Sequence, residues 1–123
     1  MTHLLVVDDN ADVAEAVSIA LTEAGYATTA ARTLSDARER INSTEIDGVI
    51  VDVWMDTDNG LEFAAEIAKH TPPTPFIVMS GGGPGKSLEA VTARADSLGA
   101  AAVLFKPFED DELLNAVRAM LAS

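Results

Sequence analysis

The chain has no cysteine and few basic residues, and each shortage excludes a class of protein. Its 123 residues contain no cysteine, which excludes disulfide scaffolds, thiolate metal sites and cysteine nucleophiles. Eight lysines and arginines stand against 20 aspartates and glutamates, so the formal net charge is −12. Because such a surface repels phosphate backbones, we expect the chain to bind cations or proteins and no nucleic acid.

Long hydrophobic runs are also missing. No apolar stretch approaches the ~20 residues that span a bilayer, and the N-terminus lacks the basic and apolar segments of a signal peptide. We therefore expect a cytoplasmic protein that has no contact with a membrane. A length of 123 residues suits a single domain, over residues 1–123, with a core of its own.

Short apolar runs alternate with segments of helical period along the whole chain. The runs predict strands near 3–8, 26–31, 47–53, 75–80 and 101–105. The helical segments lie near 11–24, 34–42, 60–69, 86–98 and 109–122. Strands rich in Val, Ile and Leu that alternate with helices indicate a parallel sheet covered on both faces. We expect an α/β fold of the doubly wound, flavodoxin-like type, with strand order 2-1-3-4-5.

Polar residues follow four of the predicted strands. Asp8 and Asp9 lie at the carboxyl end of the first strand, Asp52 at that of the third, Ser80 at that of the fourth and Lys106 just after the fifth. Burying an unpaired carboxylate costs several kcal/mol, so acids at such positions indicate a site. In open α/β sheets, ligands bind at the carboxyl ends of the strands where the strand order reverses. For the expected order, that point lies between the first and third strands.

The residue types at these strand ends suit phosphoryl chemistry. Three neighbouring carboxylates repel one another unless a cation lies between them, and Mg²⁺ fits a set with few protein ligands better than Ca²⁺. A carboxylate beside a metal and a lysine can attack phosphorus and form an aspartyl phosphate. Asp52 is the candidate nucleophile, Lys106 would neutralise the phosphoryl oxygens, and Ser80 with nearby backbone amides would hold a third oxygen.

Five short motifs occur in order along the chain. They are Asp8-Asp9, Asp52 followed by Met55 and Gly60, Ser80-Gly81, Gly99-Ala100, and Lys106-Pro107-Phe108. Each motif alone is weak, but together, at these intervals, they are highly specific. Over its whole length the chain resembles the receiver domains of bacterial two-component response regulators, of the single-domain chemotaxis type.

The resemblance implies a function for each of these residues. Asp52 would accept a phosphoryl group from a sensor histidine kinase or a histidine phosphotransfer protein. Asp8, Asp9, Asp52 and the backbone carbonyl of Trp54 would bind Mg²⁺. Ser80, the Gly81 amide and Lys106 would contact the phosphoryl group, and the Lys106–Pro107 bond would be cis. The chain would be a stand-alone switch for an unknown downstream protein. It would assist its own phosphorylation and dephosphorylation without being a metabolic enzyme.

The chain also departs from the usual pattern of this family. Asp56 takes the place of a common proline, and Val103 stands where an aromatic residue usually swings inward on activation. By the resemblance, the kinase would dock on the exposed part of the first helix, where Ala11, Ala14 and Ser18 are small.

Three other functions compete with the switch. Because Val103 replaces the usual aromatic residue, one alternative is a degenerate receiver that acts as a phosphorylation-independent interaction module. A phosphotransfer enzyme or phosphatase with an aspartate nucleophile would show Asp-x-Asp after the first strand, which Asp8-Asp9-Asn10 does not match. The segment from Ser80 to Ser87 ends like a P-loop, but it lacks the first glycine of that motif and follows the fourth strand instead of the first.

Overall fold

The structure is a computed structural model, and it describes residues 1–55, 58–81 and 88–122. Five parallel strands form one sheet in the order β2-β1-β3-β6-β7. They are β1 (His3–Val7), β2 (Ala27–Ala31), β3 (Gly48–Asp52), β6 (Phe76–Ser80) and β7 (Ala102–Phe105). Counted along the chain, this is the order 2-1-3-4-5, so the predicted fold class is confirmed.

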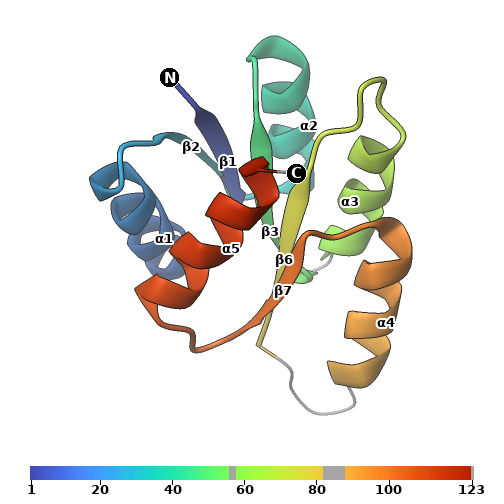
Figure 1. The fold of residues 1–123 in the computed structure, drawn as a ribbon. Helices are drawn as coiled ribbons and strands as arrows, with labels where there is room; N and C mark the ends of the chain where they lie inside the picture. The colour runs from blue at the N-terminus through green and yellow to red at the C-terminus, as the bar shows by residue number, and fades with distance from the viewer. Residues whose placement is uncertain (56–57, 82–87, 123) are drawn as a thin grey trace.

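Helices cover both faces of the sheet (Figure 1). They are α1 (Ala11–Glu23), α2 (Leu34–Ser43), α3 (Gly60–Ala68), α4 (Leu88–Leu98) and α5 (Asp110–Ala122). α1 and α5 lie on one face, and α2, α3 and α4 lie on the other. Within the described part of the chain, every helix is too short or too polar to serve as a membrane span.

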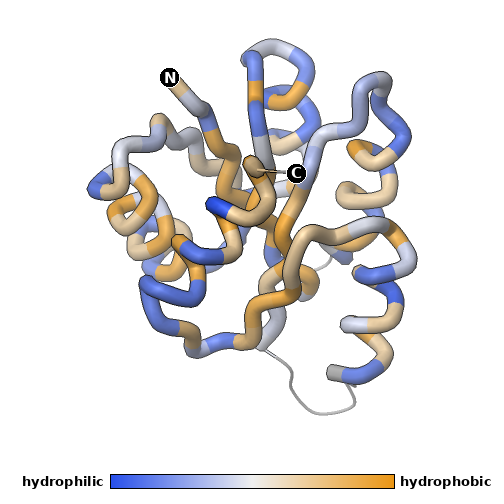
Figure 2. Tube along the Cα trace, in the orientation of Figure 1, coloured by the Kyte–Doolittle hydropathy of each residue, from blue (hydrophilic) through white to orange (hydrophobic). Residues whose placement is uncertain are grey.

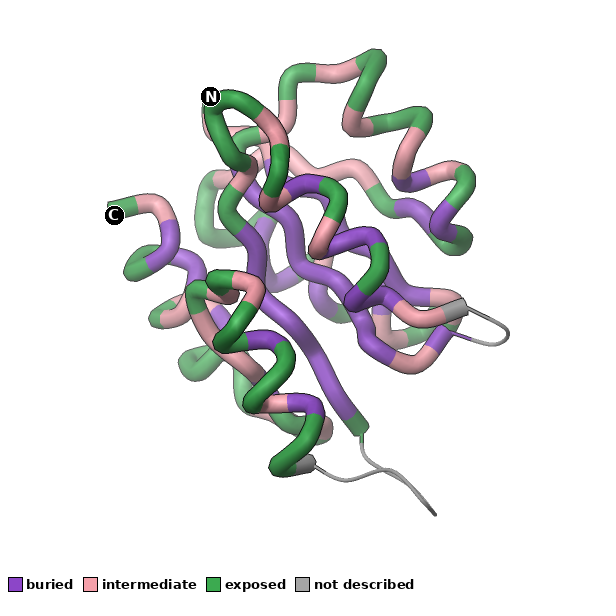
Figure 3. The backbone as a smooth tube through the Cα atoms, turned by 90° about the vertical axis from the view of Figure 1, so that its right-hand side faces the viewer, coloured by how far each residue is buried: buried purple, intermediate pink, exposed green. Residues whose placement is uncertain are grey.

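The sheet separates two hydrophobic cores because successive side chains of a strand point to opposite faces. In β1, Leu4 and Val6 belong to the core under α1 and α5. Leu5 and Val7 belong to the core under α2, α3 and α4. The central strands are therefore apolar along their length (Figure 2) and buried on both faces (Figure 3). A polar group at a strand end stands out against this background.

The helix ends follow local sequence signals. Gly25 and Gly99, which follow α1 and α4, both have positive φ, at 99° and 90°. Thr33 caps α2 by accepting a hydrogen bond from the backbone N–H of Asp36. At α1 the cap is Asn10, whose Oδ1 accepts from the N–H groups of the second and third residues of the helix. Asp8 and Asp9 are therefore free of the capping role that an aspartate pair at this position could have had.

A short antiparallel pair, β4 (Trp54–Met55) and β5 (Asp58–Asn59), follows β3. The sequence did not predict it, because two-residue strands carry no periodic signal. Asp56 lies outside the described residues, as do residues 82–87 of the segment that resembles a P-loop. The fourth helix, predicted from 86, is described from Leu88 onward.

Candidate functional site

Three carboxylates meet at the carboxyl end of the sheet. Asp8 follows β1 and Asp52 ends β3, and these two strands are paired neighbours. One oxygen from each of Asp8, Asp9 and Asp52 lies within 4.8 Å of the others. Asp8 has no exposed surface and Asp52 is 4% exposed. Oxygen ligands so close together suit a hard divalent cation, which removes their mutual repulsion.

Lys106, which follows the edge strand β7, reaches the same place. Its Nζ lies 2.8 Å from Oδ2 of Asp8 and 3.1 Å from Oδ1 of Asp52. Burial lowers the pKa of Lys106. The hydrogen bond to Asp8 and the charges of Asp52 and Asp8 outweigh that effect, so this pKa lies above its usual value. The lysine is therefore a permanent cation in the site near neutral pH.

The environment of Asp52 makes its carboxylate costly to ionise. Burial raises the pKa of Asp52 from 3.8 to about 6; Lys106 lowers this pKa, and the charges of Asp8 and Asp9 raise it. Near neutral pH the group is still mostly ionised, because its pKa lies below the ambient pH. A poorly solvated carboxylate of this kind is suited to nucleophilic attack or to metal binding.

Hydrogen bonds fix the direction of the Asp8 carboxylate. Its Oδ1 accepts a hydrogen bond of 2.9 Å from the backbone N–H of Asn10, and its Oδ2 accepts one of 2.8 Å from Lys106. Sequence reasoning missed Asn10, although an Asx residue just before a helix is a recognisable N-cap signal. Asn10 therefore both starts α1 and holds one carboxylate of the site.

Ser80 and Gly81 lie beside Lys106. Ser80 is fully buried at the end of β6, and its carbonyl accepts a 2.8 Å hydrogen bond from the N–H of Lys106. A Cβ added to Gly81 would lie 3.8 Å from Cδ of Lys106. The Lys106–Pro107 bond is cis, as the resemblance implied. These contacts place the main chain of Ser80 and Gly81 next to Lys106.

Trp54 follows Asp52 by two residues in the short β4 strand. Its side chain is partly buried and packs against the core under α2, α3 and α4. The indole is thus held by apolar contacts, two residues after Asp52 in the chain.

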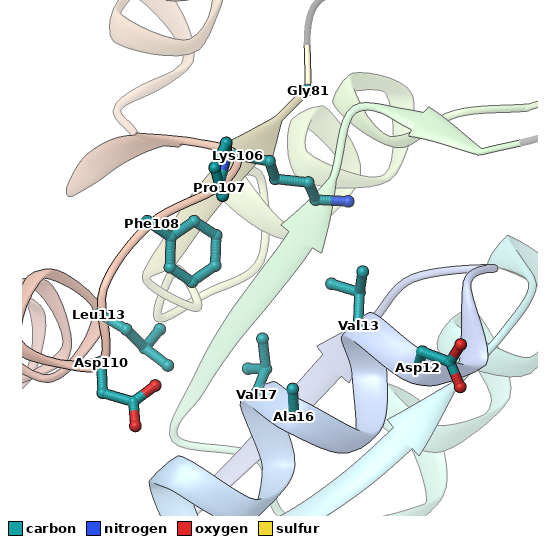
Figure 4. Close-up of a pocket in the computed structure, with 10 residues that line it drawn as sticks. All are labelled: Asp12, Val13, Ala16, Val17, Gly81, Lys106, Pro107, Phe108, Asp110 and Leu113. Carbon is teal, nitrogen blue, oxygen red and sulfur yellow. The ribbon is translucent and has the colours of Figure 1, made fainter.

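An apolar groove lies between α1 and the start of α5 (Figure 4). We call it the α1–α5 groove. Its volume is about 470 Å³, and its lining includes Val13, Ala16, Val17, Pro107, Phe108 and Leu113, with Asp12 and Asp110 among them. It extends to Lys106 and Gly81, so it borders the acidic site. Sequence reasoning missed this groove because its walls come from two segments far apart in the chain.

The exposed side of α1 differs from the prediction at Ala14, and Ser18 is only partly exposed, with its hydroxyl oxygen buried. Ala14 is 4% exposed and belongs to the core under α1 and α5, so the expectation that it faces a partner is wrong. The register of the helix turns Ala16 toward the α1–α5 groove instead. A helix has 3.6 residues per turn, so two positions along the chain change the face by about 200°.

Comparisons with known proteins agree on one family. The profile of the response regulator receiver domain matches residues 4–118. Response regulator SaeR of Staphylococcus aureus (strain USA300) is 32% identical over 123 residues, which cover 98% of this chain and 51% of SaeR. The chain therefore spans only part of such curated relatives, between 25% and 51% of their length.

Solved structures show the same fold. The chemotaxis protein CheY4 of Vibrio cholerae has a TM-score of 0.86 and 28% identity, over 98% of this chain and 99% of that one. A response regulator protein from Burkholderia pseudomallei has a TM-score of 0.83 and 27% identity, over 94% of this chain and 66% of that one. That structure is described with a phosphorylated aspartic acid, a calcium ion and citrate.

Proposed function

This chain belongs to the family of response regulator receiver domains, and we propose that Asp52 is the residue that accepts its phosphoryl group. Receiver domains are the phosphoacceptor switches of two-component systems, and they take phosphate from histidine kinases. The observation that carries the proposal is the position of Asp52. It is the buried carboxylate that ends β3, it lies in the acidic cluster, and it is paired with Lys106.

We assign the divalent cation of this family to the acidic cluster and propose that it is Mg²⁺. Asp8, Asp9 and Asp52 provide carboxylate oxygens within 4.8 Å of one another, and the backbone carbonyl of Trp54 would add a fourth ligand. A set of hard oxygen ligands that leaves room for water suits Mg²⁺. When bound, the ion would neutralise charge on the phosphoryl oxygens.

The reaction is a transfer between a phosphohistidine and an aspartate. A carboxylate oxygen of Asp52 attacks phosphorus, so an O–P bond forms while the P–N bond of the donor breaks. The electron pair of the broken bond returns to the imidazole ring, which takes up a proton. Lys106, the hydroxyl of Ser80 and the N–H of Gly81 donate hydrogen bonds to the phosphoryl oxygens. Water later attacks phosphorus, releases inorganic phosphate and restores the carboxylate.

The surface around the site supports the proposed partners. The α1–α5 groove borders Lys106 and Gly81, so a histidine kinase or phosphotransfer protein that docks there brings its phosphohistidine to Asp52. A net charge of −12 favours a downstream partner that is a protein rather than a nucleic acid. We propose that this chain acts on that protein as a phosphorylation switch, in the cytoplasm where the kinase obtains ATP.

The test uses Trp54, the only tryptophan of the chain. Its fluorescence is followed while Mg²⁺ and then acetyl phosphate are added, and the Asp52→Asn variant is treated in parallel. We expect a saturable response to Mg²⁺ and a second change that the variant lacks, with a matching gain of one phosphoryl group by mass spectrometry. Identical traces and masses for the two proteins would contradict the proposal.

One observation favours a second candidate, a phosphorylation-independent interaction module. Val103 pairs with Val78 in the sheet and packs against the core under α2, α3 and α4. A small side chain there offers no aromatic ring to move between two positions. This candidate requires that a protein partner bind wild type and Asp52→Asn equally well, before and after treatment with acetyl phosphate.

A further inference from the structure

Helix α3 begins directly against the main chain of Asp52. A Cβ added to Gly60, the first residue of α3, would collide with the carbonyl oxygen of Asp52 and would lie 2.9 Å from its carbonyl carbon. Gly60 is not among the described glycines with positive φ. It is therefore the absence of a side chain, and not a left-handed backbone, that this position requires.

Between Asp52 and Gly60, the described residues on either side of positions 56 and 57 are hydrogen-bonded to one another. The N–H of Gly60 donates a 2.8 Å hydrogen bond to the carbonyl of Val53, and Trp54 pairs with Asn59. Asn59 also caps α3, because its Oδ1 accepts a 2.8 Å hydrogen bond from the N–H of Leu61. The start of α3 is thus joined to the main chain of Trp54 and lies against the main chain of Asp52.

We propose that Gly60 is a positioning residue for the phosphoacceptor. The contact between Gly60 and the Asp52 carbonyl fixes where β3 ends, and with it the direction of the Asp52 carboxylate. Through the pairing of Asn59 with Trp54, it also fixes the main chain of Trp54. This inference rests on the proposed function, because it concerns two of the groups assigned there to the metal.

The physical reason is that a site for a metal and a phosphoryl group tolerates only small displacements of its residues. Ligand distances in metal sites are held to about 0.2 Å, and a misplacement of about 1 Å near reacting groups can cost roughly a hundredfold in rate. A side chain at position 60 must push apart two pieces of main chain. Because neither piece can rotate away as a side chain can, the displacement falls on Asp52.

Gly48 offers a matched control at the opposite end of β3. A Cβ at Gly48 would meet the methyl end of the Met120 side chain, which can change its rotamer. Gly48→Ala therefore disturbs the same strand and costs stability, but it leaves the main chain around Asp52 in place. A role of Gly60 in packing alone would make the two alanine variants behave alike toward Mg²⁺.

The experiment compares wild type, Gly60→Ala and Gly48→Ala. Circular dichroism and urea unfolding in EDTA establish that each protein is folded, and Mg²⁺ titration of the Trp54 fluorescence gives each dissociation constant. We expect Gly60→Ala to raise the dissociation constant for Mg²⁺ about tenfold or more. Gly48→Ala should keep the wild-type value within about twofold. A folded Gly60→Ala protein that binds Mg²⁺ like Gly48→Ala would overturn the proposal.

A second pair of variants applies if Gly60→Ala does not fold. Asn59→Ala removes the cap of α3, and Thr33→Ala removes the corresponding cap of α2. Each loss costs about 1 kcal/mol of stability and adds no atom. Asn59→Ala should weaken Mg²⁺ binding severalfold while Thr33→Ala leaves it unchanged; equal affinities would overturn the proposal.

The behaviour of wild type distinguishes failure of the positioning role from failure of the proposed function. If wild type binds Mg²⁺ and is phosphorylated at Asp52 while every variant matches its control, only the positioning role is wrong. If wild type itself fails to bind Mg²⁺ or to take up phosphate, the proposed function fails, and the positioning role fails with it.

Discussion

The ammonium group of Lys106 lies 2.8 Å from a carboxylate oxygen of Asp8, a residue with no exposed surface that is 98 positions away in the sequence. The lysine therefore neutralises part of the negative charge of the carboxylates in the site. This ion pair joins the first and last strands of the chain at the site. It also predicts how the site responds when either partner is lost.

Replacing the lysine should destabilise the metal-free protein. Lys106→Ala leaves the buried Asp8 carboxylate without its cation, and breaking a buried pair in this way costs about 3 kcal/mol or more. We expect urea unfolding in EDTA to show this loss and saturating Mg²⁺ to restore part of it. Lys69→Ala, at an exposed position, is the control and should change little. A Lys106→Ala protein as stable as this control would mean that the pair contributes nothing to stability.

Replacing the phosphoacceptor should stabilise the metal-free protein in a pH-dependent way. The folded-state pKa of Asp52 is raised from 3.8 to about 6, so the folded protein binds this proton more tightly than the unfolded chain does. Wild type therefore loses stability as the pH rises through that interval, and the full loss is present above pH 6. Each pKa unit is worth about 1.4 kcal/mol, so Asp52→Asn should gain a few kcal/mol at most.

The measurement for this variant is urea unfolding in EDTA from pH 4 to pH 7.5. The advantage of Asp52→Asn over wild type should be near zero at the acidic end and largest at the neutral end. Asp96→Asn, which changes an exposed acid of α4, should show no such trend. A constant difference across the pH range would contradict the raised pKa.

Metal binding should depend on Asp9 and not on the acid that follows it in α1. Mg²⁺ at about 100 times its dissociation constant should stabilise wild type by roughly 3 kcal/mol. Asp9→Ala removes one of the three clustered carboxylates and should abolish most of this gain. Asp12→Ala changes an exposed acid in the first turn of α1 and should retain it. The readout is the unfolding temperature with and without Mg²⁺, and equal gains in the two variants would place the metal elsewhere.

The α1–α5 groove should matter for the protein donor and not for a small one. Phe108→Ser removes an apolar wall, and Ala16→Glu places a charge in the groove. The kinase used is the one that phosphorylates wild type fastest among a panel of purified histidine kinases. We expect both variants to lose at least about tenfold in transfer from that kinase, since apolar anchors carry most of the energy of an interface. Phosphorylation by acetyl phosphate should stay near the wild-type rate, and a parallel loss with both donors would contradict docking in the groove.

The sequence by itself determined the order of the elements and the chemistry at the strand ends. Runs such as Leu4 to Val7 and Phe76 to Met79 are apolar because both faces of the sheet are covered, so the pattern within a few residues identifies each strand. Helix ends at Gly25, Thr33 and Gly99 depend on the backbone conformation or hydrogen bonding of single residues. Such features are local, and local features can be read along the chain.

The tertiary structure decided what these elements bring together. The distances from Lys106 to Asp8 and Asp52, the α1–α5 groove and the contact of Gly60 with Asp52 join segments that only the packing of the sheet and helices makes neighbours. The same packing buries Ala14 and turns Ala16 outward. The raised pKa of Asp52 has the same origin, because it reflects loss of solvent around a carboxylate, and solvent is removed only when distant segments close over it.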